Sequence, residues 1–154
     1  MLLRGVRFSL VGPELEDVIG PMVRERGLED LVFPGGPVTG PEKDACFAAA
    51  DVFIQTSWSE GMPMGILEAM GHGLCCLVTS GTRMHREIQE NGAGYGCETE
   101  AEAIAGKLET LIADPQAIDR MGRRARELAE EKYDWTKIGR SAVEKYAEIV
   151  SAAR

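Results

Sequence analysis

Short apolar runs alternate with helical segments along residues 1–98, and this alternation constrains the fold more than any other feature of the chain. Strands that alternate with helices form a parallel sheet with right-handed crossovers. The runs are almost continuously apolar, as expected of strands covered by helices on both faces. The predicted strands are residues 6–11, 31–33, 51–55, 74–78 and 95–97.

Helical patterns fill the gaps between these strands and continue to the end of the chain. The predicted helices are residues 14–26, with a kink at Gly20-Pro21, and residues 41–50, 63–71, 82–90, 100–113, 115–131 and 136–153. We therefore expect an α/β fold, a Rossmann-like parallel sheet flanked by helices, with extra C-terminal helices. One domain is expected over residues 1–154, in which 1–98 alternate between strand and helix and 99–154 are helical.

The composition fits one folded domain and excludes several classes of partner. A chain of 154 residues, 44% hydrophobic, buries roughly 70% of its unfolded surface without a metal or a disulfide. The net charge of −8 repels phosphate backbones, so we expect no nucleic-acid partner. No apolar run approaches the ~20 residues of a transmembrane segment. Residues 1–4 show no secretory signal, so we expect a cytoplasmic protein.

The four cysteines lack the spacing of a metal site or a redox site. Cys46, Cys75, Cys76 and Cys97 form no CxxC or CxxH pattern, and adjacent thiols such as Cys75 and Cys76 bridge badly. We therefore expect reduced, buried thiols.

The segment of residues 57–70 is the strongest candidate for a site, because a strand leads into it and a helix leads out. Ligands of parallel sheets bind beyond the carboxyl ends of the strands, and the N–H groups of a helix start favour an anion such as phosphate. Glu60 lies in the loop and Glu68 lies about one turn into the helix. Carboxylates of this kind suit sugar hydroxyls, which donate to them. The spacing alone carries no weight, since Glu90 and Glu98 are equally far apart.

Glu60 and Glu68, with Gly61, Pro63 and Gly73, resemble the E-x(7)-E motif of retaining, nucleotide-sugar-dependent glycosyltransferases with the GT-B fold. Further matches follow the family order along the chain. They are Val-Gly-Pro at 11–13, the loop at 31–35, Ala-Asp-Val-Phe-Ile at 50–54 and Tyr-Asp-Trp at 133–135. The ordered set resembles the donor-binding, C-terminal half of a group 1 (family 4) enzyme, and it covers nearly the whole chain.

The resemblance implies a role for each matching residue. Glu60, the predicted catalytic residue, would contact hydroxyls of the donor sugar, and Glu68 would hold the ribose hydroxyls. The loop 34–38 would lie at the nucleobase. The predicted donor-binding residues are Gly12, Gly35, Val38, Gly61, Met62, Pro63, Met64, Gly65 and Glu68. No cofactor and no metal is implied, because the nucleotide-diphosphate sugar, of UDP or GDP type, is the substrate.

Two features depart from the family pattern. The resemblance implies a basic pair that grips the diphosphate and an N-terminal acceptor-binding domain, and neither is expected within residues 1–154, so we expect the isolated chain to be inactive. The usual Gly-Gly-x-x-Glu turn reads Gly81-Thr82-Arg83-Met84-His85-Arg86-Glu87, so Thr82 replaces the second glycine. The last helix crosses to the N-terminal domain in the family, so here it is expected to be partly exposed or to mediate self-association.

Three alternatives stay open. The chain could be a non-catalytic nucleotide-sugar-binding or assembly module that works with a partner chain. It could be a relative of GT-B epimerases or phosphorylases, although the carboxylate, histidine and lysine sets of those enzymes are not visible. It could be a Rossmann-like domain kept for folding contacts alone. The nucleobase, sugar, acceptor and linkage stay undetermined, as does attachment of the full-length enzyme to the inner membrane; capsule, glycolipid and other polysaccharide synthesis all remain open.

Overall fold

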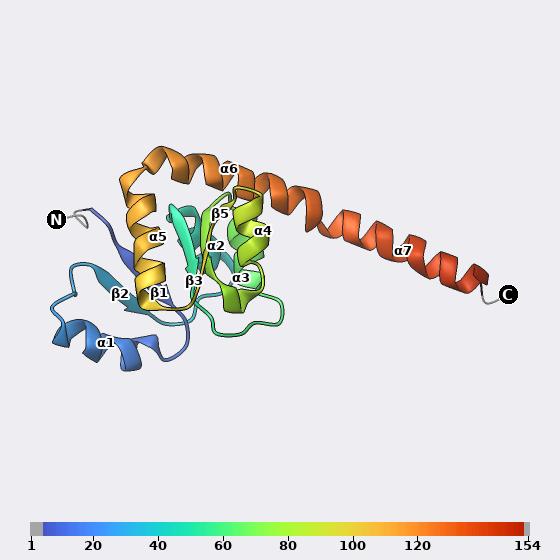
Figure 1. Cartoon of the computed structure of the whole chain (residues 1–154). Helices are drawn as coiled ribbons and strands as arrows, with labels where there is room; N and C mark the ends of the chain where they lie inside the picture. Colours follow the sequence, from blue (N-terminus) through green and yellow to red (C-terminus); the bar gives the residue numbers. More distant parts are fainter. Residues whose placement is uncertain (1–4, 153–154) are drawn as a thin grey trace. The chain divides into compact units, whose positions relative to one another are not determined.

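Residues 5–152 are described by a computed structural model, in which strands and helices alternate before a helical C-terminal part (Figure 1). The α/β prediction is confirmed. The chain divides into two compact units, residues 1–49 and residues 50–154, and the prediction of one domain over 1–154 stays a prediction. The prediction that residues 1–4 carry no secretory signal falls on residues outside those described. The elements are β1 (Phe8–Val11), α1 (Leu15–Glu25), β2 (Val32–Gly35), α2 (Gly40–Ala48), β3 (Val52–Gln55), α3 (Met64–Gly71), β4 (Cys75–Thr79), the 3-10 helix η1 (Ser80–Thr82), α4 (His85–Glu90), β5 (Gly94–Cys97), α5 (Ala101–Ala113), α6 (Pro115–Lys132) and α7 (Trp135–Ala152).

Most elements agree with the sequence-based bounds to within two residues, and two differ in kind. The strand predicted at 31–33 continues through Pro34 and Gly35, because these residues pair with Leu10 and Val11. The helix predicted over 82–90 begins only at His85, since Thr82 belongs to η1 and Arg83 after it has a φ of 60°.

The first unit contains a two-stranded parallel sheet. β1 pairs with β2, so that Val11 lies opposite Gly35 at the carboxyl ends of both strands. The helix α1 connects the strands, and α2 follows β2. Val23 and Phe47 are the hydrophobic residues of this unit, among those described, that are buried.

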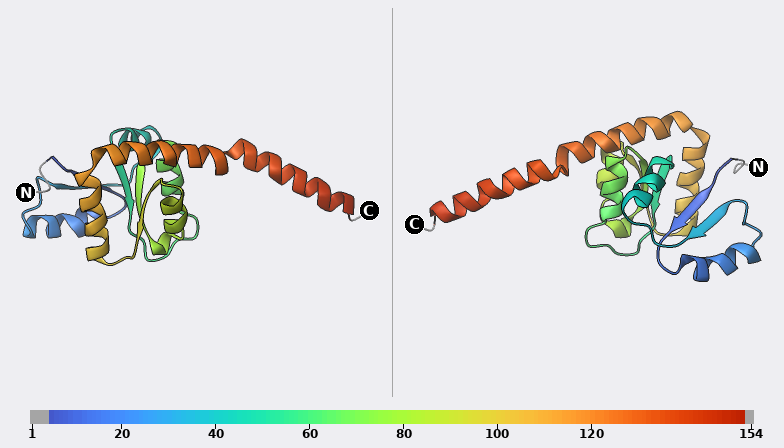
Figure 2. Two further views of the ribbon diagram at one scale, coloured as in Figure 1. Left: turned by 45° about the horizontal axis from the view of Figure 1, so that its top comes forward. Right: turned by 180° about the vertical axis from the view of Figure 1, so that it is seen from behind.

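The second unit is built around the parallel sheet β3-β4-β5, with β4 in the centre. All five residues of β4 are buried. Cys75 and Leu77 form a core with Leu111 of α5, so this face of the strand is covered by α5 and the start of α6. Cys76 and Val78 point to the other face, because side chains alternate along a strand. Figures 1 and 2 show α5 on one side of this sheet and α4 on the other.

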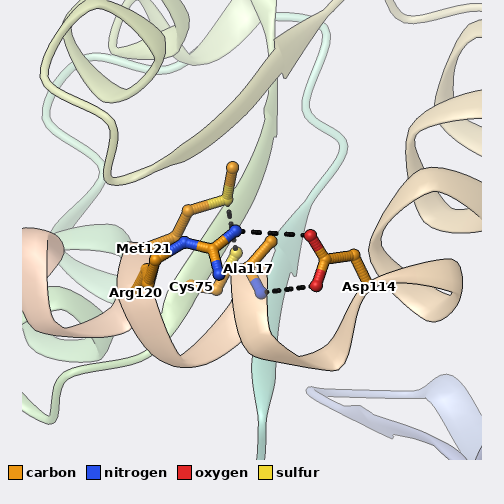
Figure 3. Close-up of polar contacts among 5 residues, drawn as sticks. All are labelled: Cys75, Asp114, Ala117, Arg120 and Met121. Atoms are coloured by element: carbon orange, nitrogen blue, oxygen red, sulfur yellow. Dashed lines mark hydrogen bonds and ion pairs between the residues drawn. The ribbon is translucent and has the colours of Figure 1, made fainter.

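The helix α6 begins at a side-chain N-cap, Asp114, and contacts the sheet further along. The Asp114 carboxylate accepts a hydrogen bond from the Ala117 backbone N–H at 3.1 Å and pairs with Arg120 at 3.3 Å (Figure 3). Met121, further along α6, places its sulfur 3.8 Å from the Cys75 thiol of β4. The N-cap therefore stabilises the start of α6, and the contact between Met121 and Cys75 packs this helix against β4.

The helix α7 follows α6 and contributes no buried residue to the described chain (Figure 1). Ala153, at the end of the predicted helix, lies outside the described residues. None of the helices within residues 5–152 combines the length and apolar composition that a membrane crossing requires. The large hydrophobic residues that α7 exposes are Trp135, Ile138, Val143, Tyr146, Ile149 and Val150.

Candidate functional site

The loop between β3 and α3 lies at the carboxyl edge of the three-stranded sheet. β3, β4 and β5 run in parallel and end at Gln55, Thr79 and Cys97. The loops that follow β3 and β4 therefore meet at one edge, where parallel sheets bind ligands. The structure confirms that Glu60 lies in the first of these loops, and it brings Gly81 of the second loop into contact with it.

Glu60 is held at its backbone and at one of its two carboxylate oxygens. The Glu60 Oε1 atom accepts hydrogen bonds from Gln55 Nε2 at 2.8 Å and from Ser57 Oγ at 2.7 Å. Its backbone N–H donates to the Gly81 carbonyl at 2.9 Å. Within residues 5–152 no hydrogen bond involves the second oxygen, Oε2. The half-buried side chain is thus fixed while one acceptor stays available.

The β4 loop supports the Glu60 loop through direct backbone contact. Thr79, a residue that is 1% exposed, donates from its hydroxyl to the Ser57 carbonyl at 2.8 Å. A Cβ atom on Gly81 would collide with the carbonyl groups of Ser57 and Trp58. Only glycine allows this approach, which agrees with the resemblance of Gly81 to the first glycine of the family turn.

Thr82 replaces the second glycine of the family turn without loss of the turn itself. Its hydroxyl donates to the Thr79 carbonyl at 2.7 Å and accepts from the Met84 backbone N–H at 3.3 Å. The side chain is completely buried. The threonine hydroxyl therefore bridges the turn, and Thr82 has no left-handed φ that would require a glycine.

Glu87 does not face the Glu60 loop. Its carboxylate accepts hydrogen bonds from Lys132 Nζ at 2.7 Å and from the Tyr133 hydroxyl at 2.6 Å, at the end of α6. Partial burial alone would raise the pKa of Glu87, but these two hydrogen bonds and the Lys132 charge hold that pKa below its usual range. Glu87 therefore links α4 to α6.

The start of α3 leaves several backbone donors open. Pro63 stands at the N-cap position, and no side chain caps the helix. In the described part of the chain, the N–H groups of Gly61, Met62 and Gly65 make no hydrogen bond to a carbonyl. Met62 and Met64 are exposed beside them. Open donors at the positive end of a helix favour an anion.

Glu68 lies on α3, one turn beyond Met64, and is half-buried. It belongs to the same connection as Glu60, in the second unit. The remaining predicted residues belong to the first unit. Gly12 follows β1, Gly35 ends β2 beside it, and Val38 lies between β2 and α2. The register of β1 and β2 brings Gly12 and Gly35 to one edge of that sheet.

The cysteine prediction holds for two of the four thiols. Cys75 and Cys76 are completely buried, and burial raises the pKa of both, that of Cys75 to about 12. Cys97 is half-buried. The prediction is wrong for Cys46, which is exposed because the buried side chain of its helix is that of Phe47. All four are free thiols. Among residues 5–152 no three His, Cys, Asp or Glu side chains gather as a metal site requires.

Sequence reasoning missed the contacts that hold Glu60 and its loop in place, those of Gln55 with Glu60 and of Thr79 with Ser57. Gln55 lies five residues before Glu60 and Thr79 lies 22 residues after Ser57. No periodic pattern marks these contacts, because they depend on the path of an irregular loop. A polar residue at the end of an apolar strand was the one available signal for Gln55.

The fold and this loop define the class of protein: a Rossmann-like, C-terminal half of a GT-B glycosyltransferase. The family model described as "Glycosyl transferases group 1" matches residues 2–128, and the chain belongs to this family.

Comparisons with individual proteins agree with this assignment. The chain is 32% identical over 130 residues to the D-inositol 3-phosphate glycosyltransferase of Paenarthrobacter aurescens. This match covers 84% of the chain and 32% of the relative. The chain thus spans about a third of the length of such curated relatives. Among solved structures, Anabaena Alr3699/HepE in complex with UDP and glucose has 25% identity and a TM-score of 0.79, over 93% of this chain and 41% of that one.

A solved C-terminal domain gives the same fold by itself. The C-terminal domain of the group 1 glycosyl transferase LpcC from Francisella tularensis has a TM-score of 0.69 and 23% identity, over 79% of this chain and 64% of that chain. The prediction of a C-terminal GT-B half is confirmed at the level of the fold.

Proposed function

We propose that this chain is the donor-binding domain of a retaining glycosyltransferase that takes a UDP- or GDP-sugar. The observation that carries the proposal is Glu60, whose Oε1 is held by Gln55 and Ser57 while its Oε2 is open, beside the uncapped start of α3. Family membership supports it, and so does HepE, whose structure contains UDP and glucose.

Each part of the donor has a proposed partner in the chain. Glu60 contacts hydroxyls of the sugar, and Glu68 accepts from the ribose hydroxyls. The open N–H groups of Gly61, Met62 and Gly65, with Pro63 and Met64 beside them, face the sugar and the diphosphate. Gly12, Gly35 and Val38 belong to the nucleotide side, where main-chain groups contact the base. The helix start stabilises the charge of the leaving diphosphate, so we propose transfer without a metal or other cofactor.

We further propose that transfer requires an N-terminal acceptor-binding domain. The chain spans about a third of its curated relatives, and proximity of donor and acceptor supplies much of the rate of such reactions. The exposed apolar residues of α7 are proposed to pack on that domain or on a second copy of the chain. A non-catalytic binding or assembly module that works with a partner chain is the second candidate, and the open Glu60 site fits both. A cytoplasmic location is part of the same proposal.

The first test is an NMR titration of the chain with UDP, GDP and their sugar conjugates. Binding is expected to shift signals of residues 34–38 and 60–68. Glu68→Ala is expected to weaken binding about tenfold or more, because a charge-assisted hydrogen bond to ribose is lost.

Glu109→Ala, which removes an exposed carboxylate from α5, is the matched control and is expected to bind as the wild type does. No shift with any nucleotide would contradict the proposal. The isolated chain is expected to transfer no sugar to a simple acceptor, and turnover by it would contradict the need for the second domain.

A further inference from the structure

We propose that Gln55 is a positioning residue, which holds Glu60 so that its Oε2 atom meets the donor sugar. This inference rests on the proposed function, in which Glu60 contacts sugar hydroxyls. It concerns the sugar end of the donor, and it assigns no contact between Gln55 and the nucleotide.

Gln55 is well placed to fix another side chain, because it ends a paired strand. It is the last residue of β3 and lies opposite Val78 of the fully buried β4. Its Nε2 atom donates to Glu60 Oε1 at 2.8 Å and lies 3.4 Å from Ser57 Oγ. A strand end in a sheet moves less than a loop, so the hydrogen bond ties the loop carboxylate to the sheet.

The other end of the Gln55 amide is confined by the start of α3. Its Oε1 atom lies 3.5 Å from the point where a Cβ of Gly65 would stand, and the Phe53 ring lies 3.3 Å from the same point. The amide therefore lies between the Glu60 carboxylate and the helix start. The carboxylate needs a donor, and this requirement places the nitrogen toward Glu60 and the oxygen toward Gly65.

This arrangement prepares Glu60 for one kind of contact. With Oε1 occupied by two donors, Oε2 is the oxygen left to accept from a hydroxyl. A neutral amide donates to the carboxylate without bringing a charge to it, whereas a lysine would form an ion pair with it. A fixed side chain also loses less conformational entropy when the sugar binds.

Ser57 makes the second hydrogen bond to Oε1, and its own carbonyl is held by Thr79. Loss of Gln55 alone therefore leaves Glu60 partly restrained. The expected effect of a Gln55 substitution is a weaker sugar contact, not a collapsed loop.

The experiment measures the dissociation constants of UDP, UDP-glucose, GDP and GDP-mannose for the whole chain. The ratio of the constant for the nucleotide to that for its sugar conjugate is the sugar increment. Gln55→Leu is expected to reduce this increment by about fivefold to tenfold and to leave UDP or GDP binding unchanged. If Gln55 had only a structural role, its loss would weaken the binding of both the nucleotide and the conjugate, since the backbone N–H groups proposed to bind the diphosphate lie on the same loop.

Gln55→Asn is the second variant, because its amide is one methylene too short to reach Glu60. It is expected to lose the increment as Gln55→Leu does, and thermal unfolding shows whether each variant folds. Gln89→Leu, an exposed glutamine on α4, is the matched control and should keep the full increment.

The outcomes separate this inference from the proposed function. If the wild type shows a sugar increment that both Gln55 variants retain, the positioning role is wrong and the donor site stands. If the variants lose nucleotide and conjugate binding equally, Gln55 is structural and the inference is overturned. If the wild type binds no nucleotide or shows no increment, the proposed function fails and this inference fails with it.

Discussion

Gly81 is the residue on which the place of Glu60 depends most directly. Its carbonyl accepts the Glu60 backbone N–H at 2.9 Å, and the absence of a side chain lets it lie against the Ser57 and Trp58 backbone. Backbone atoms cannot move aside as a flexible side chain can. Any larger residue must therefore displace either the Glu60 loop or the turn after β4.

Gly81→Ala is expected to lower the free energy of unfolding by about 1–3 kcal/mol, the usual cost of overpacking. The sugar increment of donor binding should fall with it, because the displaced loop carries Glu60. Chemical denaturation measures the first effect and a nucleotide-sugar titration measures the second.

Gly106→Ala is the control, since a Cβ at Gly106 in α5 has open space around it. Alanine is the better helix former, so this variant should be unchanged or more stable by about 0.5–1 kcal/mol. If Gly81→Ala proved as stable as Gly106→Ala, the close approach would not constrain the loop.

The residues of the site were predictable to different degrees. Glu60, Glu68 and the glycines between them follow a motif, so the sequence placed them at the strand–loop–helix connection that the structure shows. The Gln55 amide and the Thr79 hydroxyl carry no such mark. Their partners are fixed only when two loops from neighbouring strands meet, and a linear pattern does not contain that distance.

At the scale of elements, periodicity and turn residues located nearly every strand and helix. The exceptions have physical causes. β2 continues through Pro34, which cannot donate to a ladder, because it lies in a two-stranded sheet. The helix after β4 starts later than expected, because the buried Thr82 hydroxyl closes a separate turn. The link from Glu87 to Tyr133 joins residues 46 apart and was not predicted.

This link fastens α4 to the end of α6, just before α7 begins. Burial and the hydrogen bond to Glu87 raise the pKa of Tyr133 to about 12. The phenol is therefore protonated at neutral pH and donates to a charged carboxylate. The stability that the raised Tyr133 pKa contributes is present below the ordinary tyrosine pKa of 10.0 and is lost as the pH rises toward 12.

Glu87 gives the opposite dependence, because its pKa is lower in the folded state. The contribution of Glu87 to stability is present above the ordinary glutamate pKa of 4.5 and is lost as the pH falls through the lowered pKa of the folded state. Glu87→Gln is expected to destabilise the chain at pH 7, and the difference from the wild type should shrink below pH 4.5. Urea denaturation across this pH range measures it.

Glu148→Gln removes an exposed partner of Lys145, at 2.9 Å on α7, and serves as the control. An exposed pair of this kind contributes little at any pH, so its denaturation curve should follow the wild type. A constant difference between Glu87→Gln and the wild type from pH 7 down to below 4.5 would show that the carboxylate charge does not carry the link.

At the scale of the whole molecule, the buried core belongs mainly to the second unit. Of the buried hydrophobic residues described, Val23 and Phe47 alone lie in the first unit, whereas β4 is buried along its whole length. Local opening costs more free energy where more apolar contacts must break. The two units are therefore expected to differ in stability, although each contains a parallel sheet.

Amide hydrogen exchange tests this expectation directly. The amides of β4 are expected to show the highest protection, and those of β1 and β2 to show protection factors lower by roughly a hundredfold, which corresponds to about 3 kcal/mol in opening free energy. The helix α7, with no buried residue, provides the internal reference for rapid exchange. If the donor contacts Gly35 and Val38 as proposed, its binding should also slow exchange in β1 and β2, because a ligand that binds only the folded state adds to the free energy of opening. Equal protection of β1, β2 and β4 without ligand would contradict the expected difference in stability between the two units.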